Sequence, residues 1–158
     1  MVFVCENNFY SVYTHIKDRQ PQHRKLFKLA QALGAKSNKF NQDNPYNLYM
    51  KFKNIFHKVR KNPYPHFIEI ETYRYLEHCG PNDDTHLGYR TDKELKHWKK
   101  KDPLIFSRGF LLKKNIIKKS KINLIDKKIK NSVDIEFNSI KNLKKPSFSK
   151  IKGLVYKK

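Results

Sequence analysis

The chain has 158 residues, of which 38% are hydrophobic, and it carries a formal net charge of +21. This length fits about one domain with a modest core, and two cysteines are too few for a disulfide scaffold but fit a reducing cytoplasm. No apolar run approaches the ~20 residues of a membrane span and no secretion signal is recognisable, so we expect a cytoplasmic protein with no membrane partner.

The positive charge suggests nucleic-acid binding, but its distribution argues against it. Residues 113–158 hold 15 lysines against 3 acidic residues, interleaved with isoleucine and asparagine. That pattern is typical of a compositional bias in which lysine fills solvated positions. Because no helix-turn-helix, zinc-finger or aromatic RNA-binding signature occurs, we expect no nucleic-acid partner.

The first half of the chain alternates predicted strands and helices. A short apolar run at residues 2–5 predicts a buried strand, and a polar turn follows it. Residues 11–20 are irregular and predict a loop. Pro21 then begins a predicted helix that stops at Gly34. Its apolar face consists of Leu26, Leu29, Ala30 and Leu33.

A strand at residues 35–40 and a turn at 41–45 lead into a second predicted helix, which Asn62 and Pro63 end. Residues 67–73 alternate and are β-branched, which predicts a third strand. The order strand, helix, strand, helix, strand is the signature of an α/β sheet with crossover helices. The second helix is predicted from the helical spacing of Leu48, Phe52, Ile55, Phe56 and Val59.

The second half begins with residues 75–89, which have no periodicity and predict a long functional or disordered loop. Thr91 and Glu94 form a capping-box pattern that predicts a helix, and Asp102-Pro103 ends it and begins another. Residues 144–158 predict a basic, surface-lying end. A stripe predicts the last helix: Ile122, Ile125, Ile129, Val133, Phe137 and Ile140.

The turn after the first strand is a candidate ligand site. In open α/β sheets ligands bind at the carboxyl ends of the strands. The side-chain carbonyls of Asn7 and Asn8 and nearby backbone carbonyls suit a hard cation such as Mg²⁺. An asparagine pair after a strand is more often simply a turn, and the spacing leaves both interpretations open.

Three motifs stand in order: Glu-Asn-Asn-Phe-Tyr at residues 6–10, Tyr-Arg-Tyr-Leu-Glu-His at 73–78 and Gly-Tyr-Arg-Thr at 88–91. Trp98 and an Asp-Pro-Leu segment at 102–104 follow them. Together they resemble the alpha subunit of thiamine-diphosphate-dependent 2-oxo acid dehydrogenases of the pyruvate or acetoin type. The order and spacing of these separate motifs make the resemblance specific, and it runs through the entire chain.

The resemblance implies an α/β fold and a division of the chain. Residues 1–112 would be the C-terminal portion of a thiamine-diphosphate-binding parallel-sheet domain. Residues 113–158 would be a Lys-rich, helical C-terminal extension. The family's Gly-Asp-Gly segment should lie well before Asn8, and the chain starts too late to contain it. We therefore expect a fragment, the C-terminal half of an alpha subunit, inactive when alone.

The resemblance also implies roles for five residues. Asn8 matches a metal-ligating asparagine, and the Tyr10 backbone carbonyl matches a second Mg²⁺ ligand. His78 matches a catalytic-loop histidine that contacts the cofactor's diphosphate. Arg74 and Arg90 match basic residues that flank and order that loop. The implied cofactors are thiamine diphosphate and Mg²⁺.

The implied activity is oxidative decarboxylation of a pyruvate-like 2-oxo acid, with acyl transfer to a lipoyl-bearing acyltransferase component. The implied assembly is a heterotetramer with a dehydrogenase beta subunit. Leu76 and Glu77 depart from the family, where histidine and glycine are frequent. The alternative is a degenerate, non-catalytic fragment that acts as a basic interaction module.

Simpler interpretations of the individual side chains remain open. Arg74 could pair with Glu69 or Glu71 in a structural ion pair. His78 could be an exposed loop histidine with no role. A zinc site would need three side chains that lack a recognised ligand spacing: His78, Cys79 and His86.

Overall fold

A computed structural model describes residues 1–41, 44–147 and 149 of the chain. It divides into two compact units, Met1–Phe110 and Leu111–Lys158, which are described separately. The predicted turn at 41–45 and the predicted basic end at 144–158 lie partly outside the described residues. The functional division at residue 112 stays a prediction.

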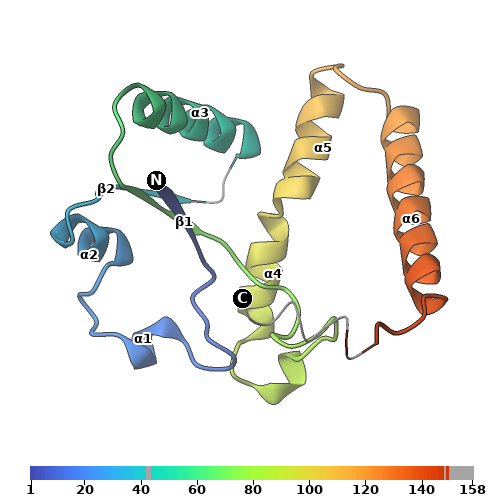
Figure 1. The fold of residues 1–158 in the computed structure, drawn as a ribbon, viewed down its shortest axis with the longest axis horizontal. Coiled ribbons are helices and arrows are strands. Elements are labelled where there is room, and N and C mark those ends of the chain that lie inside the picture. Colours follow the sequence, from blue (N-terminus) through green and yellow to red (C-terminus); the bar gives the residue numbers. More distant parts are fainter. Residues whose placement is uncertain (42–43, 148, 150–158) are drawn as a thin grey trace. The chain divides into compact units, whose positions relative to one another are not determined.

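The first unit is built on a parallel sheet of three strands, β1 (Val2–Asn7), β2 (Lys36–Asn41) and β3 (His66–Glu71). Their order is β1-β3-β2, so β3 is central (Figure 1). Val2, His66 and Lys36 are aligned in register. All three strands therefore end at one edge of the sheet, and the predicted α/β class is confirmed.

Two helices cover opposite sides of this sheet (Figure 1). The chain passes from β1 to β2 and returns to the central β3, and right-handed crossovers in opposite directions place their helices on opposite faces. α2 (Leu26–Ala32) packs on β2 and β3. α3 (Pro45–Lys61) begins where the Asn44 side chain accepts hydrogen bonds from the Tyr46 and Asn47 amides.

β1 confirms the predicted strand but not its predicted burial. Phe3 is 49% exposed and Val4 48% exposed. The reason is topological, because β1 has only β3 as a neighbour within the described sheet and α2 packs on the other two strands. The apolar sequence of β1 thus lies on an open sheet edge.

The segment between β1 and α2 also differs from the prediction. A short helix, α1 (Ile16–Arg19), lies inside the predicted loop, and the His15 side chain caps it by accepting from the Lys17 amide at 3.0 Å. α2 begins at Leu26 rather than at Pro21. A turn closed by the Arg24 amide and the Pro21 carbonyl occupies the interval.

The predicted capping box is half confirmed. The Thr91 hydroxyl accepts from the Glu94 amide at 3.1 Å, but the Glu94 carboxylate binds the Tyr10 hydroxyl rather than the Thr91 amide. The Asp102 carboxylate caps the next helix through the Leu104 amide at 2.7 Å. These two helices are α4 (Asp92–Lys100) and α5 (Pro103–Lys113), and a short 3-10 helix, η1 (Thr85–Leu87), lies before them within the predicted loop at residues 75–89.

The second unit contains α6 (Lys119–Lys141), which confirms the predicted last helix. Most of its predicted apolar stripe is exposed, including Ile129, Val133 and Phe137. In the part of the chain that the structure describes, no helix is both long and apolar enough to cross a membrane.

Candidate functional site

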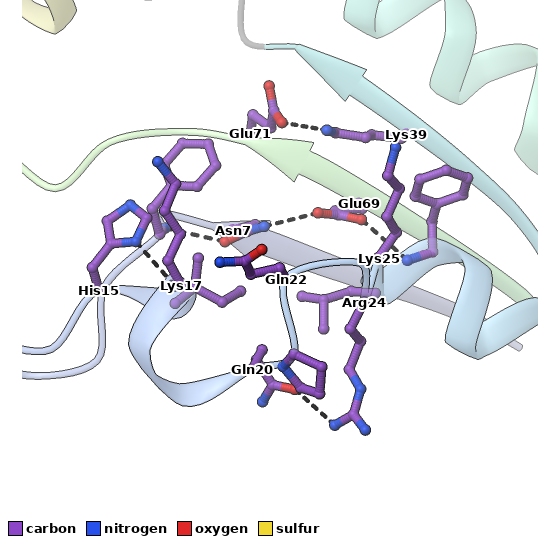
Figure 2. A pocket seen from close by; sticks show the side chains of 15 residues that line it. Asn7, His15, Lys17, Gln20, Gln22, Arg24, Lys25, Lys39, Glu69 and Glu71 are labelled. Atoms are coloured by element: carbon purple, nitrogen blue, oxygen red, sulfur yellow. Dashed lines mark hydrogen bonds and ion pairs between the residues drawn. The ribbon is translucent and has the colours of Figure 1, made fainter.

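A cleft of about 440 Å³ opens at the carboxyl edge of the sheet (Figure 2). Its walls come from the end of β1, from α1 and from the start of α2. Parallel α/β sheets bind ligands at this edge. The edge positions two groups of side chains, one inside the cleft and one around the turn that follows β1.

The floor of the cleft is a closed set of hydrogen bonds around Glu69, which is 4% exposed. Its carboxylate accepts from the Asn7 side-chain amide at 2.8 Å and from the Phe27 backbone amide at 3.1 Å. Glu71 is paired with Lys39. Both acids therefore have partners other than Arg74, so the interpretation of Arg74 as their ion-pair partner is wrong.

The turn after β1 is held by its own asparagines. The Asn7 side-chain carbonyl accepts from the Phe9 amide at 3.1 Å, and the Asn8 side-chain carbonyl accepts from the Tyr10 amide at 2.9 Å. Phe9 takes a left-handed backbone conformation with φ of +67°. The two asparagines thus build the turn itself, as their preference for such turns predicts.

The same turn carries two oxygen atoms that fit a hard cation. The Asn8 side-chain oxygen has a second lone pair besides the one used by Tyr10. The Tyr10 backbone carbonyl accepts no hydrogen bond from the described residues. Two hard, neutral oxygen donors two residues apart suit Mg²⁺, which needs further oxygen ligands to complete its shell.

Tyr10 connects this turn to more distant parts of the unit. Its hydroxyl donates to the Glu94 carboxylate, at 2.9 and 3.0 Å from the two oxygens. Its ring meets Tyr89 edge-on at 5.6 Å between centroids and Tyr73 at 6.5 Å. Burial, followed by the hydrogen bond to Glu94, raises the pKa of the Tyr10 phenol. The turn is therefore packed against the loop that follows β3.

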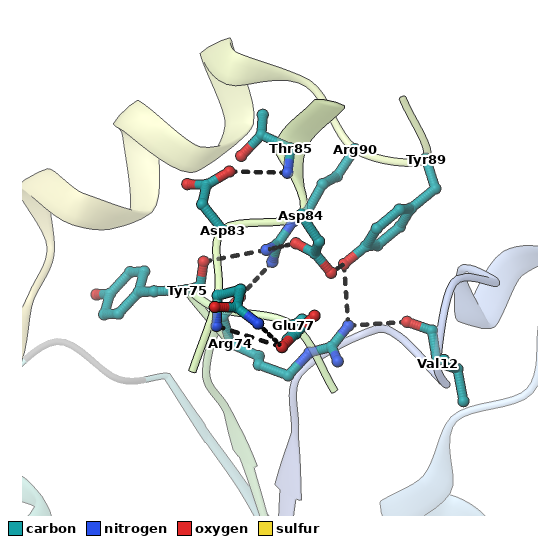
Figure 3. Close-up of polar contacts among 10 residues, drawn as sticks. Val12, Arg74, Tyr75, Glu77, Asp83, Asp84, Thr85, Tyr89 and Arg90 are labelled. Atoms are coloured by element: carbon teal, nitrogen blue, oxygen red, sulfur yellow. Dashed lines mark hydrogen bonds and ion pairs between the residues drawn. The ribbon is translucent and has the colours of Figure 1, made fainter. Parts of the chain in front are cut away.

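A buried ion pair holds that loop together at its base (Figure 3). Arg90 is 3% exposed and Asp84 1% exposed, and the guanidinium donates to the carboxylate. Arg90 also donates to the backbone carbonyls of Arg74 and Tyr75, the latter at 3.0 Å. One side chain thereby ties both ends of the loop together.

Tyr89 completes the environment of Asp84. Its hydroxyl donates to the second carboxylate oxygen at 2.5 Å. Burial alone would raise the pKa of Asp84, but the hydrogen bonds from Tyr89 and Arg90 outweigh it, so the pKa lies below its ordinary value. Burial and the hydrogen bond to Asp84 raise the pKa of Tyr89 to about 12. Asp84 is therefore an anion and Tyr89 a neutral donor at neutral pH.

Arg74 extends the cluster to the segment after the β1 turn. Its guanidinium donates to the Val12 carbonyl at 2.8 Å and to the Tyr89 hydroxyl at 3.1 Å. Its Nε and Nη1 atoms are buried and have no partner within the described residues. Arg74 and Arg90 thus lie together at the base of the loop, while their role toward a cofactor stays a prediction.

His78 lies apart from these groups, exposed on the loop. Beside it, Glu77 accepts from the Asn82 side-chain amide at 2.7 Å and closes a local turn. Among residues 1–41, 44–147 and 149, no three His, Cys, Asp or Glu side chains come together as metal ligands. The zinc alternative at His78, Cys79 and His86 is therefore not supported.

The sequence did not single out Asp84 or Glu94 as partners of the predicted site residues. Asp83 and Asp84 are adjacent and chemically identical, but the structure exposes the first and buries the second. For Glu94 the sequence predicts only a capping role. Spacing along the chain contains no signal for either contact, since both depend on packing between distant segments.

A parallel sheet with a polar turn at its carboxyl edge, and a loop held by a buried ion pair beside it, defines an α/β domain of the kind that binds ligands at that edge. The family model described as "Dehydrogenase E1 component" matches residues 1–149. The chain belongs to this family, which confirms the predicted resemblance.

Individual relatives agree with that assignment. The chain is 28% identical to the pyruvate dehydrogenase E1 component subunit alpha of Rickettsia conorii over 140 residues, 87% of this chain and 42% of the relative. It is 29% identical to the protein of the same name from Rickettsia bellii, with the same coverage. The Staphylococcus aureus (strain Mu50) protein is 28% identical over 98% of this chain and 41% of its own length. The chain thus spans about two fifths of the length of the relatives it matches.

Proposed function

We propose that this chain supplies part of the cofactor site of a pyruvate dehydrogenase-type E1 alpha subunit. The substrate is a pyruvate-like 2-oxo acid and the cofactors are thiamine diphosphate and Mg²⁺. The observation that carries the proposal is the packing of the Asn8–Tyr10 turn against the base of the loop at residues 75–89. Tyr10 contacts Tyr89, and Arg74 bonds to Val12, so two segments far apart in sequence meet at one point.

In this proposal the side-chain oxygen of Asn8 and the backbone carbonyl of Tyr10 hold the cation. Both are neutral oxygens, so the charge of the cation remains available to a diphosphate. When bound, thiamine diphosphate supplies the carbon nucleophile and electron sink that decarboxylation of a 2-oxo acid requires. The chain's own residues bind and orient it.

The loop has a separate part in the proposal. Arg90 and Asp84 fix its base, while His78 is exposed on its span. A histidine on such a loop can approach a diphosphate when the loop closes. Arg74 helps to order the loop through its hydrogen bonds to the Val12 carbonyl and the Tyr89 hydroxyl.

The working assembly contains more than this chain. Its relatives carry more than half of their length outside the matched region. We propose that the chain works with such a segment, a beta subunit and a lipoyl-bearing acyltransferase component, in the cytoplasm. By itself the chain should bind cofactor weakly, because the Asn8–Tyr10 turn supplies only two of the oxygen ligands that Mg²⁺ needs.

Calorimetry on a reconstituted assembly tests the proposal. The chain is combined with a beta subunit and with the alpha-subunit segment of a relative that it does not cover. Asn8→Ala should weaken Mg²⁺-dependent binding of thiamine diphosphate about tenfold or more, because one metal ligand is lost. Asn47→Ala, which removes an exposed amide on α3, is the matched control and should bind like the parent. Unchanged affinity in Asn8→Ala would refute the metal assignment.

The basic interaction module is the second candidate. The exposed apolar stripe of α6, flanked by lysines, is the observation that favours it. It predicts that the reconstituted assembly binds no cofactor at all, and that pull-down with the chain depends on the stripe. Removing the stripe with Ile129→Ser and Phe137→Ser should abolish such capture.

A further inference from the structure

The cleft at the carboxyl edge of the sheet is distinct from the proposed metal site. Asn7 and Phe9 line it, whereas Asn8 and Tyr10 do not (Figure 2). Neighbouring residues of one turn therefore belong to two different candidate sites, the cleft and the proposed metal site. The cleft volume of about 440 Å³ lies within the range of small-molecule sites. It has no role in the cofactor proposal, so its chemistry can be considered separately.

Both acidic side chains in the cleft already have partners. Glu71 is paired with Lys39, and Glu69 accepts two hydrogen bonds from Asn7 and Phe27. Lys39 compensates the charge of Glu71, and Glu69 is held by its two amide donors at the floor of the cleft.

Two lysines at the rim of the cleft, by contrast, lack an acidic partner within the described residues. Lys17 comes from α1 and Lys25 from the residue before α2, and they stand on opposite sides of the cleft (Figure 2). Within the described residues neither of them lies within ion-pair distance of a carboxylate. Arg24 is directed away and donates to Gln20 at 2.8 Å.

His15 adds a directed donor to this rim. Its Nδ1 accepts from the Lys17 amide at 3.0 Å, so the neutral ring carries its proton on Nε2. The ring is stacked on Phe9 at 6.3 Å with an interplanar angle of 5°, which fixes its orientation. Lys17, Lys25 and His15 therefore provide three hydrogen-bond donors around a cleft whose carboxylates already have partners. Phe9 and Leu26 provide its apolar walls.

We propose that this cleft binds a small organic dianion, a phosphate ester or a dicarboxylate with a short carbon body. Lys17 and Lys25 bind the two ends of its charge, and His15 donates a hydrogen bond from Nε2. The charged hydrogen bonds provide affinity, and the separation of the two lysines selects dianions over monoanions. The apolar walls contact the carbon body.

Titration calorimetry of the whole chain at neutral pH tests this site. Glycerol 3-phosphate and succinate are the two probes, because they share a dianionic charge and distinguish the two sources. Neither Mg²⁺ nor thiamine diphosphate is present, so failure of the cofactor proposal does not alter the result. At least one probe should bind saturably with one-to-one stoichiometry, and acetate should bind at least tenfold more weakly.

Three variants separate a built site from general attraction to a basic protein. Lys17→Gln and Lys25→Gln should each weaken binding about tenfold, since each removes one charged contact. Lys28→Gln removes the same charge from an exposed position on α2 outside the cleft, and should change affinity less than twofold. Circular dichroism checks that each variant keeps the parent fold. Absence of saturable binding by both probes, or equal weakening in all three variants, would overturn the proposal.

Discussion

Replacing Asp84 by asparagine should raise the population of an open form of the loop at residues 75–89. Asparagine has the same size and keeps one carbonyl acceptor, but it removes the charge that compensates Arg90. The Arg90 guanidinium is 3% exposed, so water cannot replace the lost carboxylate. Tyr89 also loses the anionic acceptor to which its hydroxyl donates at 2.5 Å.

The magnitude follows from the burial of the pair. Removing one partner of a buried ion pair costs about 3–5 kcal/mol, because an uncompensated charge remains inside. The lower end applies here, since asparagine still accepts one hydrogen bond and Arg90 retains two backbone carbonyls. A loss of about 3 kcal/mol corresponds to roughly a hundredfold rise in the population of the open loop.

Hydrogen exchange measured by mass spectrometry reads this opening directly. Peptides that cover the loop and its flanks should exchange about 100-fold faster in Asp84→Asn, while peptides from β3 should change less. Asp83→Asn is the control, because that neighbouring carboxylate is exposed and bonds only to the Thr85 amide in the described structure. Equal exchange in the two variants would show that the burial of the Asp84 carboxylate does not control opening of the loop.

Three further outcomes are expected. Tyr10→Phe should lower the free energy of unfolding by about 1 kcal/mol, measured in urea by Trp98 fluorescence, because Glu94 loses its phenolic donor. Asp84 has a folded-state pKa below its ordinary value, so the stability that it contributes is complete above about pH 3.9 and is lost as the pH falls through the folded-state pKa. An acid titration of the loop should therefore lose its low-pH transition in the asparagine variant. We expect the open edge of β1 to promote self-association of the chain, and Val4→Lys should reduce it in light scattering, since lysine places a charge on that edge.

Each of these has a contrary result. A Tyr10→Phe chain as stable as the parent would mean that the hydroxyl contact is energetically neutral. An unchanged low-pH transition in the Asp84 variant would assign that transition to other carboxylates. A lysine variant that associates as strongly as the parent would show that the edge of β1 does not drive association.

The parallel sheet and its crossover helices could be predicted because short-range sequence preferences agree with the elements that the fold contains. The strand at β3 alternates, Asn62 and Pro63 stop α3, and Thr91 caps α4, all within a few residues of chain. Each signal is a short-range preference of the backbone. The packed structure satisfies these preferences instead of overriding them.

Burial could not be predicted in the same way. The apolar sequence of β1 is typical of a covered strand, but Phe3 and Val4 are half exposed because exposure depends on neighbours. The short helix α1 was missed because His15 supplies its cap, and histidine is not among the preferred capping residues. Such outcomes depend on individual contacts and not on periodicity.

The candidate site was predicted in part, and from two different sources. The asparagine turn followed from residue chemistry, and the roles of Arg74, Arg90 and His78 followed from family resemblance. The structure brings the two arginines into one cluster and leaves His78 exposed. Asp84, which joins that cluster, differs from Asp83 only in burial, and burial is decided by the fold.

Limited proteolysis tests whether the loop at residues 75–89 closes over the cofactor. In a reconstituted assembly shown by calorimetry to bind thiamine diphosphate, cleavage between residues 75 and 89 is compared with and without Mg²⁺ and cofactor. Bound cofactor should suppress cleavage, and His78→Ala should restore part of it, if the loop closes over the diphosphate through His78. Equal cleavage with and without bound cofactor would contradict the claim, because the loop would then lie outside the site.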